Sequence, residues 1–207
     1  MEDQRNIWNR LYKNEGGKWR KETLNLPPIF RDKKILELGV GNGKTLKAIL
    51  RQKPKEIIAI DISKEAIKLS KDRFKRKNTF LMKKNVKKTG LKRNYFDIIV
   101  CYYILNNLLE KDRQKAVVEM ARVLKRGGII LFEDFSEEDL REKRGGKIVE
   151  KGTFLKENGI ICHFFSKMEL VELFSKFSNM KIDIKVSKPI KNKPDLIRKI
   201  ISAEIKK

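Results

Sequence analysis

The residues best suited to chemistry lie close together, in the segment 35–43. An apolar run carries Glu37, and glycines follow it at Gly39, Gly41 and Gly43. Glycines at the carboxyl end of a strand let the backbone approach a ligand closely. A carboxylate beside them disfavours a pyrophosphate and favours a ligand that carries an ammonium group. The segment therefore predicts a ligand site between a buried strand and the helix that follows it.

A second acid closes the next predicted strand. Asp61 ends an apolar run and lies eighteen residues beyond Gly43. In dinucleotide-binding folds, an acid at the end of the second strand hydrogen-bonds the ribose hydroxyls. Because Ile62 and Ser63 come next, Asp61 can equally cap the following helix. Both roles stay open for Asp61.

Strands and helices alternate along the segment that holds these residues. The hydrophobic pattern predicts strands over residues 33–38, 56–61, 78–82, 96–101 and 129–132. It predicts helices over residues 44–51, 63–74 and 113–124, the last one stopped by Gly127 and Gly128. This alternation is typical of βαβ units and a parallel sheet.

The C-terminal third has a different pattern. It predicts a hairpin around Asn158 and Gly159, then a helix from Ser166 to residue 177 and a strand over residues 181–186. Residues 197–205 fit either a strand or a helix. Their distance from the preceding strand favours an antiparallel hairpin at the edge of the sheet.

The glycine segment and Asp61 resemble the class I S-adenosylmethionine-dependent methyltransferases. Residues 97–101 and 122–128 are similar to the fourth strand of that family and to the segment that leads into its fifth. The resemblance implies an α/β, Rossmann-like seven-stranded methyltransferase sheet, mostly parallel with an antiparallel C-terminal edge hairpin. It also implies the cofactor S-adenosyl-L-methionine, bound by Glu37, Gly39, Gly41, Gly43, Asp61, Ile62, Asn85, Val86 and Cys101. The family often has Asp where this chain has Asn85, whose carbonyl oxygen can still accept a hydrogen bond from adenine.

Three further segments resemble the tRNA 3-methylcytidine methyltransferases. They are an N-terminal Trp segment over residues 8–13, an acidic segment over 134–139 and an aromatic hairpin over 152–166. The hairpin departs from that group at Lys156 and Ile160, where Arg and Thr are expected. The resemblance implies an RNA substrate, with tRNA the foremost candidate.

The same resemblance divides the chain into two parts. Residues 1–32 are expected to form an N-terminal helical lid segment. Residues 33–207 are expected to form a single S-adenosylmethionine-binding domain, with a substrate hairpin inserted near residues 135–166.

Within this framework Asp134 and Tyr102 are the predicted catalytic residues. Asp134 ends strand five, where it is placed to accept a hydrogen bond from an exocyclic amine of the target base. Tyr102 and Tyr103 follow strand four, and one of them is expected to stack on a base. Packing in the core is the alternative for either tyrosine.

Three other side chains are candidates for the substrate or the lid. Trp8 and Tyr12 are spaced i, i+4 and share a helix face. They either cover the cofactor or pack their helix onto the sheet. His163 lies in the aromatic hairpin, where a structural role is favoured over a catalytic one. Cys101 is expected to contribute backbone near the cofactor.

The charge balance indicates the class of partner. The 207 residues include 50 Lys and Arg against 27 Asp and Glu, a net charge of +23. Residues 71–93 hold eleven basic residues and one acid, and residues 181–207 hold nine and three. Residues 134–142 hold five acids and one base. This excess favours a polyanion, nucleic acid ahead of membrane, and a merely Lys-rich surface is the alternative.

The sequence argues against several classes of protein. No run of about 18 apolar residues predicts a membrane-spanning helix, and the N-terminus lacks the apolar region of a secretory signal. Cys101 and Cys162 lie far apart with one histidine in the chain, so no zinc site is expected. A reducing, cytoplasmic setting follows, and the oligomeric state stays open.

Three functional classes are compatible with these features. They are an RNA methyltransferase, a methyltransferase acting on a small metabolite or protein side chain, and a non-enzymatic RNA-binding module that keeps the fold.

Overall fold

The computed structural model describes residues 2–15, 26–143, 145–187 and 197–207. The predicted lid segment 1–32 is therefore described only in part, since residues 16–25 lie outside these ranges. Residues 188–196 of the basic C-terminal stretch also lie outside them. Within the described residues, no helix is long and apolar enough to cross a membrane.

Seven strands form the main sheet, in the order β3-β2-β1-β4-β5-β10-β9. Their bounds are β1 Lys34–Leu38, β2 Glu56–Asp61, β3 Thr79–Lys83, β4 Phe96–Tyr102, β5 Leu124–Phe135, β9 Asn179–Val186 and β10 Lys199–Lys206. The first five strands in this order are parallel to one another, and β10 runs antiparallel to both β5 and β9. The predicted mostly parallel sheet with an antiparallel C-terminal edge is confirmed, and 197–205 resolves as a strand.

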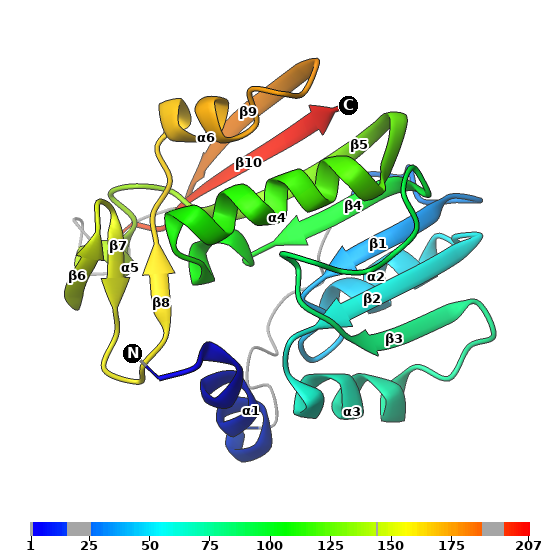
Figure 1. The fold of residues 1–207 in the computed structure, drawn as a ribbon, viewed down its shortest axis with the longest axis horizontal. Coiled ribbons are helices and arrows are strands. Elements are labelled where there is room, and N and C mark those ends of the chain that lie inside the picture. Colours follow the sequence, from blue (N-terminus) through cyan, green and yellow to red (C-terminus); the bar gives the residue numbers. More distant parts are fainter. Residues whose placement is uncertain (1, 16–25, 144, 188–196) are drawn as a thin grey trace.

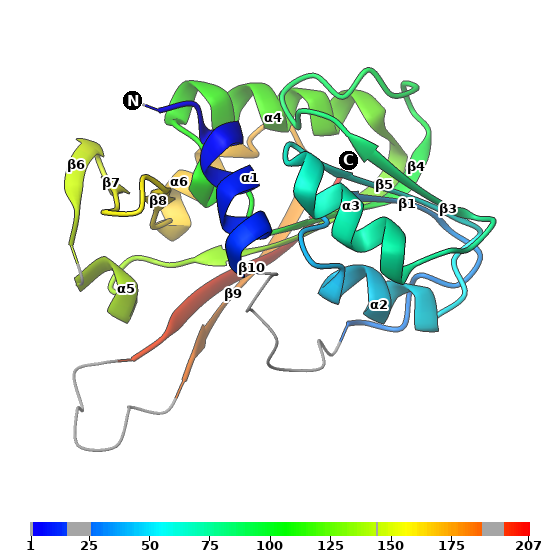
Figure 2. The same cartoon turned by 90° about the horizontal axis from the view of Figure 1, so that it is seen from below.

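Helices cover both faces of this sheet, as Figures 1 and 2 show. Their bounds are α1 Gln4–Glu15, α2 Lys44–Arg51, α3 Lys64–Arg73, η1 Leu105–Asn107, α4 Glu110–Val123, α5 Leu140–Lys143 and α6 Lys167–Leu173. Ser63 and Ser166 cap α3 and α6, each accepting a hydrogen bond from the amide three residues on. The central strands are buried on both faces, which is why they are nearly continuous apolar runs.

Two apolar clusters fill the spaces between the layers. One joins the sheet to α2 and α3 and includes Leu46, Ile67 and Leu81. The other joins the sheet to α4 and α6 and includes Met120 and Phe132. The α4 face of the sheet is covered unevenly, because α4 crosses β4 and β5 and leaves β2 and β3 without a helix (Figure 1).

A second, three-stranded sheet follows β5. It consists of β6 Lys147–Glu150, β7 Thr153–Leu155 and β8 Ile161–His163. The predicted hairpin is confirmed by the antiparallel pairing of Thr153 with His163, whereas β6 has no counterpart in the sequence prediction. Its sequence, Lys-Ile-Val-Glu, is too short for a period to stand out.

Several predicted boundaries are wrong. The helix predicted to reach residue 177 is α6, which ends at Leu173. Gly127 and Gly128 do not end the helix after β4, because α4 already ends at Val123. Leu124 is extended and pairs with Phe96, so both glycines lie within β5. The helix also begins earlier than predicted, at Glu110. The negative charges of Glu110 and Asp112 in its first turn interact favourably with the positive end of the helix dipole.

Because β1 to β5 are parallel, the main sheet has two chemically distinct edges. We name the edge at the ends of these strands the carboxyl edge and the edge at their beginnings the amino edge. Figure 1 shows α1 and the small sheet beyond the arrowheads of the strands, next to the carboxyl edge. In folds of this kind, ligands bind at the carboxyl edge.

Candidate active site

Glu37 lies in β1, at the centre of the sheet. Its side chain is 2% exposed, and its Oε2 atom has no hydrogen-bond partner among the described residues. Burial, together with the charge of Asp61, raises the pKa of Glu37 well above its usual value, and the backbone amide of Leu46 acts in the opposite direction. A buried acceptor without a partner costs free energy. The Oε2 atom of Glu37 is therefore available to accept a hydrogen bond from a donor group of a ligand.

The glycine turn brings bare backbone next to this acid. Gly41 has a φ of +52°, and a Cβ at this position would lie 2.7 Å from the hydroxyl oxygen of Tyr12. Gly39 and Gly43 also have positive φ values. Only glycine fits this path without strain. Tyr12 belongs to α1, so the N-terminal helix reaches the turn from outside the sheet.

Asp61 connects the end of β2 to the same turn. Its Oδ2 accepts a hydrogen bond of 3.0 Å from the amide of Gly41, and its Oδ1 accepts one of 2.9 Å from the amide of Ser63. Burial raises the pKa of Asp61 to about 6, although these amides lower it. Asp61 thus holds the residue that caps α3, and its predicted contact with a ribose stays a prediction.

The two acids and the glycine backbone fit S-adenosylmethionine. Glu37 and Asp61 are both buried, and each carboxylate disfavours the other's charge. A cationic group between them relieves that repulsion. The amino-acid part of S-adenosylmethionine carries an ammonium group, which the orphaned Oε2 of Glu37 can accept.

The other predicted cofactor residues also lie at the carboxyl edge. Ile62 follows β2, Asn85 and Val86 follow β3, and Cys101 is fully buried in β4. The Oδ1 atom of Asn85 accepts a hydrogen bond of 3.0 Å from the amide of Lys87. The oxygen predicted to accept from adenine therefore already has one backbone partner.

The two tyrosines after strand four have different surroundings. Tyr102 packs against the apolar cluster of α2 and α3. Tyr103 has a φ of +56° and donates a hydrogen bond of 2.6 Å to Oε1 of Glu133. Burial raises the pKa of both hydroxyls. A non-glycine residue at positive φ is strained and is often found at functional sites.

Asp134 is fully buried beneath this loop. Its Oδ2 accepts a hydrogen bond of 3.0 Å from the amide of Asn106, and its Oδ1 accepts one from the amide of Phe135. Burial raises its pKa to about 8. Both carboxylate oxygens already accept backbone hydrogen bonds, and the predicted contact of Asp134 with an exocyclic amine stays a prediction.

Two residues near Asp134 were missed by sequence reasoning. Asn106 is 3% exposed, and its Oδ1 has no partner among the described residues. Glu133 precedes Asp134 and bonds Tyr103. The strand alternation next to Asp134 was a signal for Glu133, whereas an Asn in a short 3-10 turn has no recognisable pattern.

The N-terminal helix spans the carboxyl edge. Asn9 accepts hydrogen bonds from the hydroxyl of Ser63 at 2.8 Å and from the amide of Lys64 at 3.0 Å. Gln4 donates one of 2.9 Å to the carbonyl of Gly159, in the turn between β7 and β8. The shared face of Trp8 and Tyr12 is confirmed, with ring centroids 6.0 Å apart. The lid role stays a prediction, and Asn9 had no signal in the sequence.

His163 lies inside the small sheet. Its ring nitrogens contact Thr153 Oγ1 at 2.8 Å and Glu169 Oε2 at 2.9 Å. Glu169 in turn pairs with the buried Arg113 of α4 at 3.3 Å. With both nitrogens engaged and 1% of its surface exposed, His163 fastens the small sheet to α4 and α6.

Comparison with known proteins agrees with this geometry. Residues 36–132 match the family model described as a methyltransferase domain. The chain is 28% identical over 197 residues to the tRNA N(3)-methylcytidine methyltransferase trm140 of Schizosaccharomyces pombe, covering 84% of this chain and 64% of that protein. It is also 28% identical over 124 residues to the ubiquinone/menaquinone biosynthesis C-methyltransferase UbiE of Yersinia enterocolitica, covering 57% and 49%. The chain thus spans about half of one of these relatives and just under two-thirds of the other.

A solved structure extends the likeness to the fold. The S-adenosylmethionine-dependent methyltransferase of Methanosarcina mazei superposes with a TM-score of 0.68 at 25% identity, covering 88% of this chain and 99% of that one. The glycine turn, Glu37 and Asp61 lie within the matched methyltransferase domain. Residues 36–132 of this chain thus match a methyltransferase domain, and the chain has the fold of the S-adenosylmethionine-dependent methyltransferases.

Proposed function

We propose that this protein methylates a base in RNA, with tRNA as the substrate and S-adenosylmethionine as the methyl donor. The observation that carries the proposal is its similarity to a tRNA 3-methylcytidine methyltransferase over 84% of the chain. That span includes the carboxyl edge, where the buried acids lie. We also propose a cytoplasmic location, where tRNA is found.

The residues of the carboxyl edge would hold the methyl donor. When bound, S-adenosylmethionine supplies an electrophilic methyl group attached to a positively charged sulfur. Glu37 would accept hydrogen bonds from its ammonium group, and Asp61 from its ribose. The glycine turn allows close approach, and Tyr12 of α1 closes the site from outside. Exclusion of water strengthens each of these interactions.

The target base requires alignment more than proton transfer. The N3 atom of cytidine has a free lone pair at neutral pH, so no strong general base is needed. The base must be unpaired, because N3 takes part in Watson–Crick pairing. Tyr103, held in a strained conformation beside Glu133, is the side chain best placed to stack on it.

Incubation with labelled S-adenosylmethionine and total RNA, followed by nucleoside mass spectrometry, tests this function. We expect label in 3-methylcytidine from tRNA. Label in protein or in small molecules alone, with none in RNA, would refute the proposal.

A small-metabolite methyltransferase is the second candidate. The likeness to UbiE, over 57% of the chain, favours it. This candidate predicts little affinity for RNA at physiological salt, whereas an RNA enzyme shows steep salt dependence because phosphate contacts release counterions.

A further inference from the structure

The amino edge of the sheet, opposite the active site, carries an unusual set of charges. Lysines and arginines precede β1, β2, β3 and β4. In β5 they precede the part that pairs with β4 from Ile129 onwards. The exposed ones are Arg31, Lys33, Lys53, Lys55, Lys75, Arg76, Lys77, Lys92, Arg93 and Arg126. We name these ten residues the amino-edge cations.

The amino-edge cations have few acids of the protein near them, and Asp97, which lies near Lys33, already pairs with Lys125 at 2.6 Å. In the part of the chain that the structure describes, none of them forms an ion pair within 4.0 Å. Asp32 is the exposed acid in the same connections. Besides burial, the charges of Arg93 and Arg126 lower the pKa of Lys207, so cations gather closely there. Such a concentration of unpaired charge fits a polyanion.

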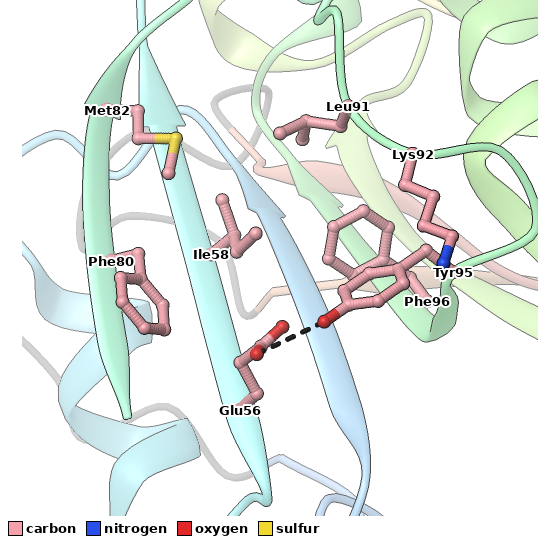
Figure 3. Close-up of a pocket in the computed structure, with 8 residues that line it drawn as sticks. All are labelled: Glu56, Ile58, Phe80, Met82, Leu91, Lys92, Tyr95 and Phe96. Carbon is pink, nitrogen blue, oxygen red and sulfur yellow. Dashed lines mark hydrogen bonds between the residues drawn. The ribbon is translucent and has the colours of Figure 1, made fainter. Parts of the chain in front are cut away.

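Beside these cations lies an apolar groove of about 370 Å³, shown in Figure 3. It is lined by Glu56, Ile58, Phe80, Met82, Leu91, Lys92, Tyr95 and Phe96. The groove lies on the α4 face of β2 and β3, which no helix covers (Figure 1). Its volume falls within the range of about 300–1,000 Å³ that is typical of small-ligand pockets.

Aromatic rings stand on both sides of this groove. Phe80 of β3 and Tyr95 lie on opposite sides of Ile58, which forms the floor (Figure 3). Phe80 is 43% exposed, which is high for a large apolar side chain. The Nζ atoms of Lys34 and Lys92 lie 4.0 and 5.9 Å from the centre of the Tyr95 ring. Aromatic rings among cations form the usual platform for an unpaired base.

The groove also contains an unused hydrogen-bond acceptor. Tyr95 donates its hydroxyl hydrogen to Oε2 of Glu56 at 3.2 Å, whereas Oε1 of Glu56 is buried and has no partner among the described residues. A carboxylate accepts hydrogen bonds from the amino group of a base. Uracil lacks such an amino group, and its ring N3–H donor lies between two carbonyl oxygens, which a carboxylate repels.

We infer that the amino edge is an RNA-binding surface, in which the amino-edge cations contact phosphates and the groove takes one unpaired amino-bearing base stacked on Phe80. This inference rests on the proposed function and adds a second point of contact to it. The six residues of β2 span about 20 Å from one edge to the other. A small metabolite in the active site cannot reach the groove across that distance, whereas an RNA can.

Fluorescence anisotropy with ten-nucleotide oligomers of rA, rC, rG and rU, measured without cofactor, tests the surface. We expect rU to bind most weakly. Phe80→Ala should weaken binding of rA, rC and rG by about 5- to 100-fold. Glu56→Gln should reduce the preference over rU. Met168→Ala, which removes another exposed apolar side chain, is the matched control and should change nothing.

Two further measurements keep the test decisive. Affinity for S-adenosylmethionine should be the same in Phe80→Ala as in wild type, which shows that the variant is folded. If it is not folded, the double variant Lys92→Ala/Arg93→Ala, on exposed residues, replaces it and should weaken all four oligomers.

The outcomes separate this surface from the proposed function. Unchanged RNA affinity in these variants overturns the surface, even if cytidine in tRNA is methylated. Loss of binding to a poly-glutamate peptide, with RNA binding unchanged, also overturns it and identifies a protein-docking site. Weakened RNA binding with no methylation of any RNA upholds the surface and refutes the proposed function.

Discussion

The two edges of the main sheet use charge in opposite ways. At the carboxyl edge the charges are acidic, buried and individually placed: Glu37, Asp61 and Asp134 are each less than 10% exposed. At the amino edge the ten amino-edge cations are exposed and have no ion-pair partner in the described residues, and the ion pair found there joins Asp97 to Lys125 instead. Buried charge is expensive unless a ligand or hydrogen bonds compensate it, whereas exposed charge acts over longer range and is screened by salt. The comparison separates the carboxyl edge, which is suited to catalysis, from the amino edge, which is suited to binding a polyanion.

The largest effect is expected at the carboxyl edge. Glu37→Gln should weaken S-adenosylmethionine binding by about 30-fold or more, because loss of a buried charge partner costs about 2–5 kcal/mol. Isothermal titration calorimetry measures this. The cofactor-free variant should melt no lower than wild type, because it no longer buries a carboxylate. Unchanged cofactor affinity would remove Glu37 from the site.

At the amino edge, neutralising charges should change salt dependence. The triple variant Lys75→Ala/Arg76→Ala/Lys77→Ala should bind tRNA about 10- to 50-fold more weakly and reduce the slope of log K against log salt by about 2. The control triple Lys111→Ala/Lys115→Ala/Lys176→Ala removes the same charge near α4 and α6. Equal losses in both triples would mean that the charge acts uniformly and that the amino edge is not special.

Not every buried polar group beyond the carboxyl edge serves chemistry. His163→Gln should lower the free energy of unfolding by about 1–2 kcal/mol, because it disturbs the contacts with Thr153 and Glu169. Cofactor affinity should stay unchanged. Denaturant melts with a parallel calorimetric titration test both points. A loss of methyl transfer without a loss of stability would assign His163 to the active site instead.

The stability of the fold should also depend on pH. The pKa of Asp134 rises on folding from its ordinary 3.8 to about 8, so the folded protein binds more protons than the unfolded chain between those values. Stability should therefore fall as pH rises from about 4 to about 8, by up to about 1.4 kcal/mol per unit, and flatten above. Thermal melts across this range measure it. The slope should be smaller in Asp134→Ala; an equal slope would show that another group, such as Glu37, is responsible.

Much of the fold was predictable because its signals are local. The apolar runs of β1, β2 and β4 and the caps Ser63 and Ser166 all depend on residues close together in the chain. The weak predictions involved pairings over long distances. Residues 197–205 fitted two patterns until pairing with β5 and β9 resolved them as β10. The end of α4 depended on Leu124 pairing with Phe96.

The candidate site shows the same division. Glu37, the glycines and Asp61 were predictable because the chemistry of a strand–turn–helix junction is written in adjacent residues. Asn9 and Asn106 were not, since each acquires its role from a partner far along the chain, Ser63 and Asp134 respectively. The basic character of residues 71–93 was visible as well, but not its continuation along the amino edge.

By itself, the sequence determined the alternation of strands and helices in the parallel part of the sheet, the acids and glycines of the predicted cofactor site, and the excess of positive charge. These are properties of residue type and short-range spacing. Only the tertiary structure decided which charges share an edge, that Asp134 lies buried beneath η1, and that Phe80, Tyr95 and Glu56 enclose a groove. The reason is that parallel strands bring residues distant in sequence to one edge of the sheet, and that burial depends on which helix covers each face.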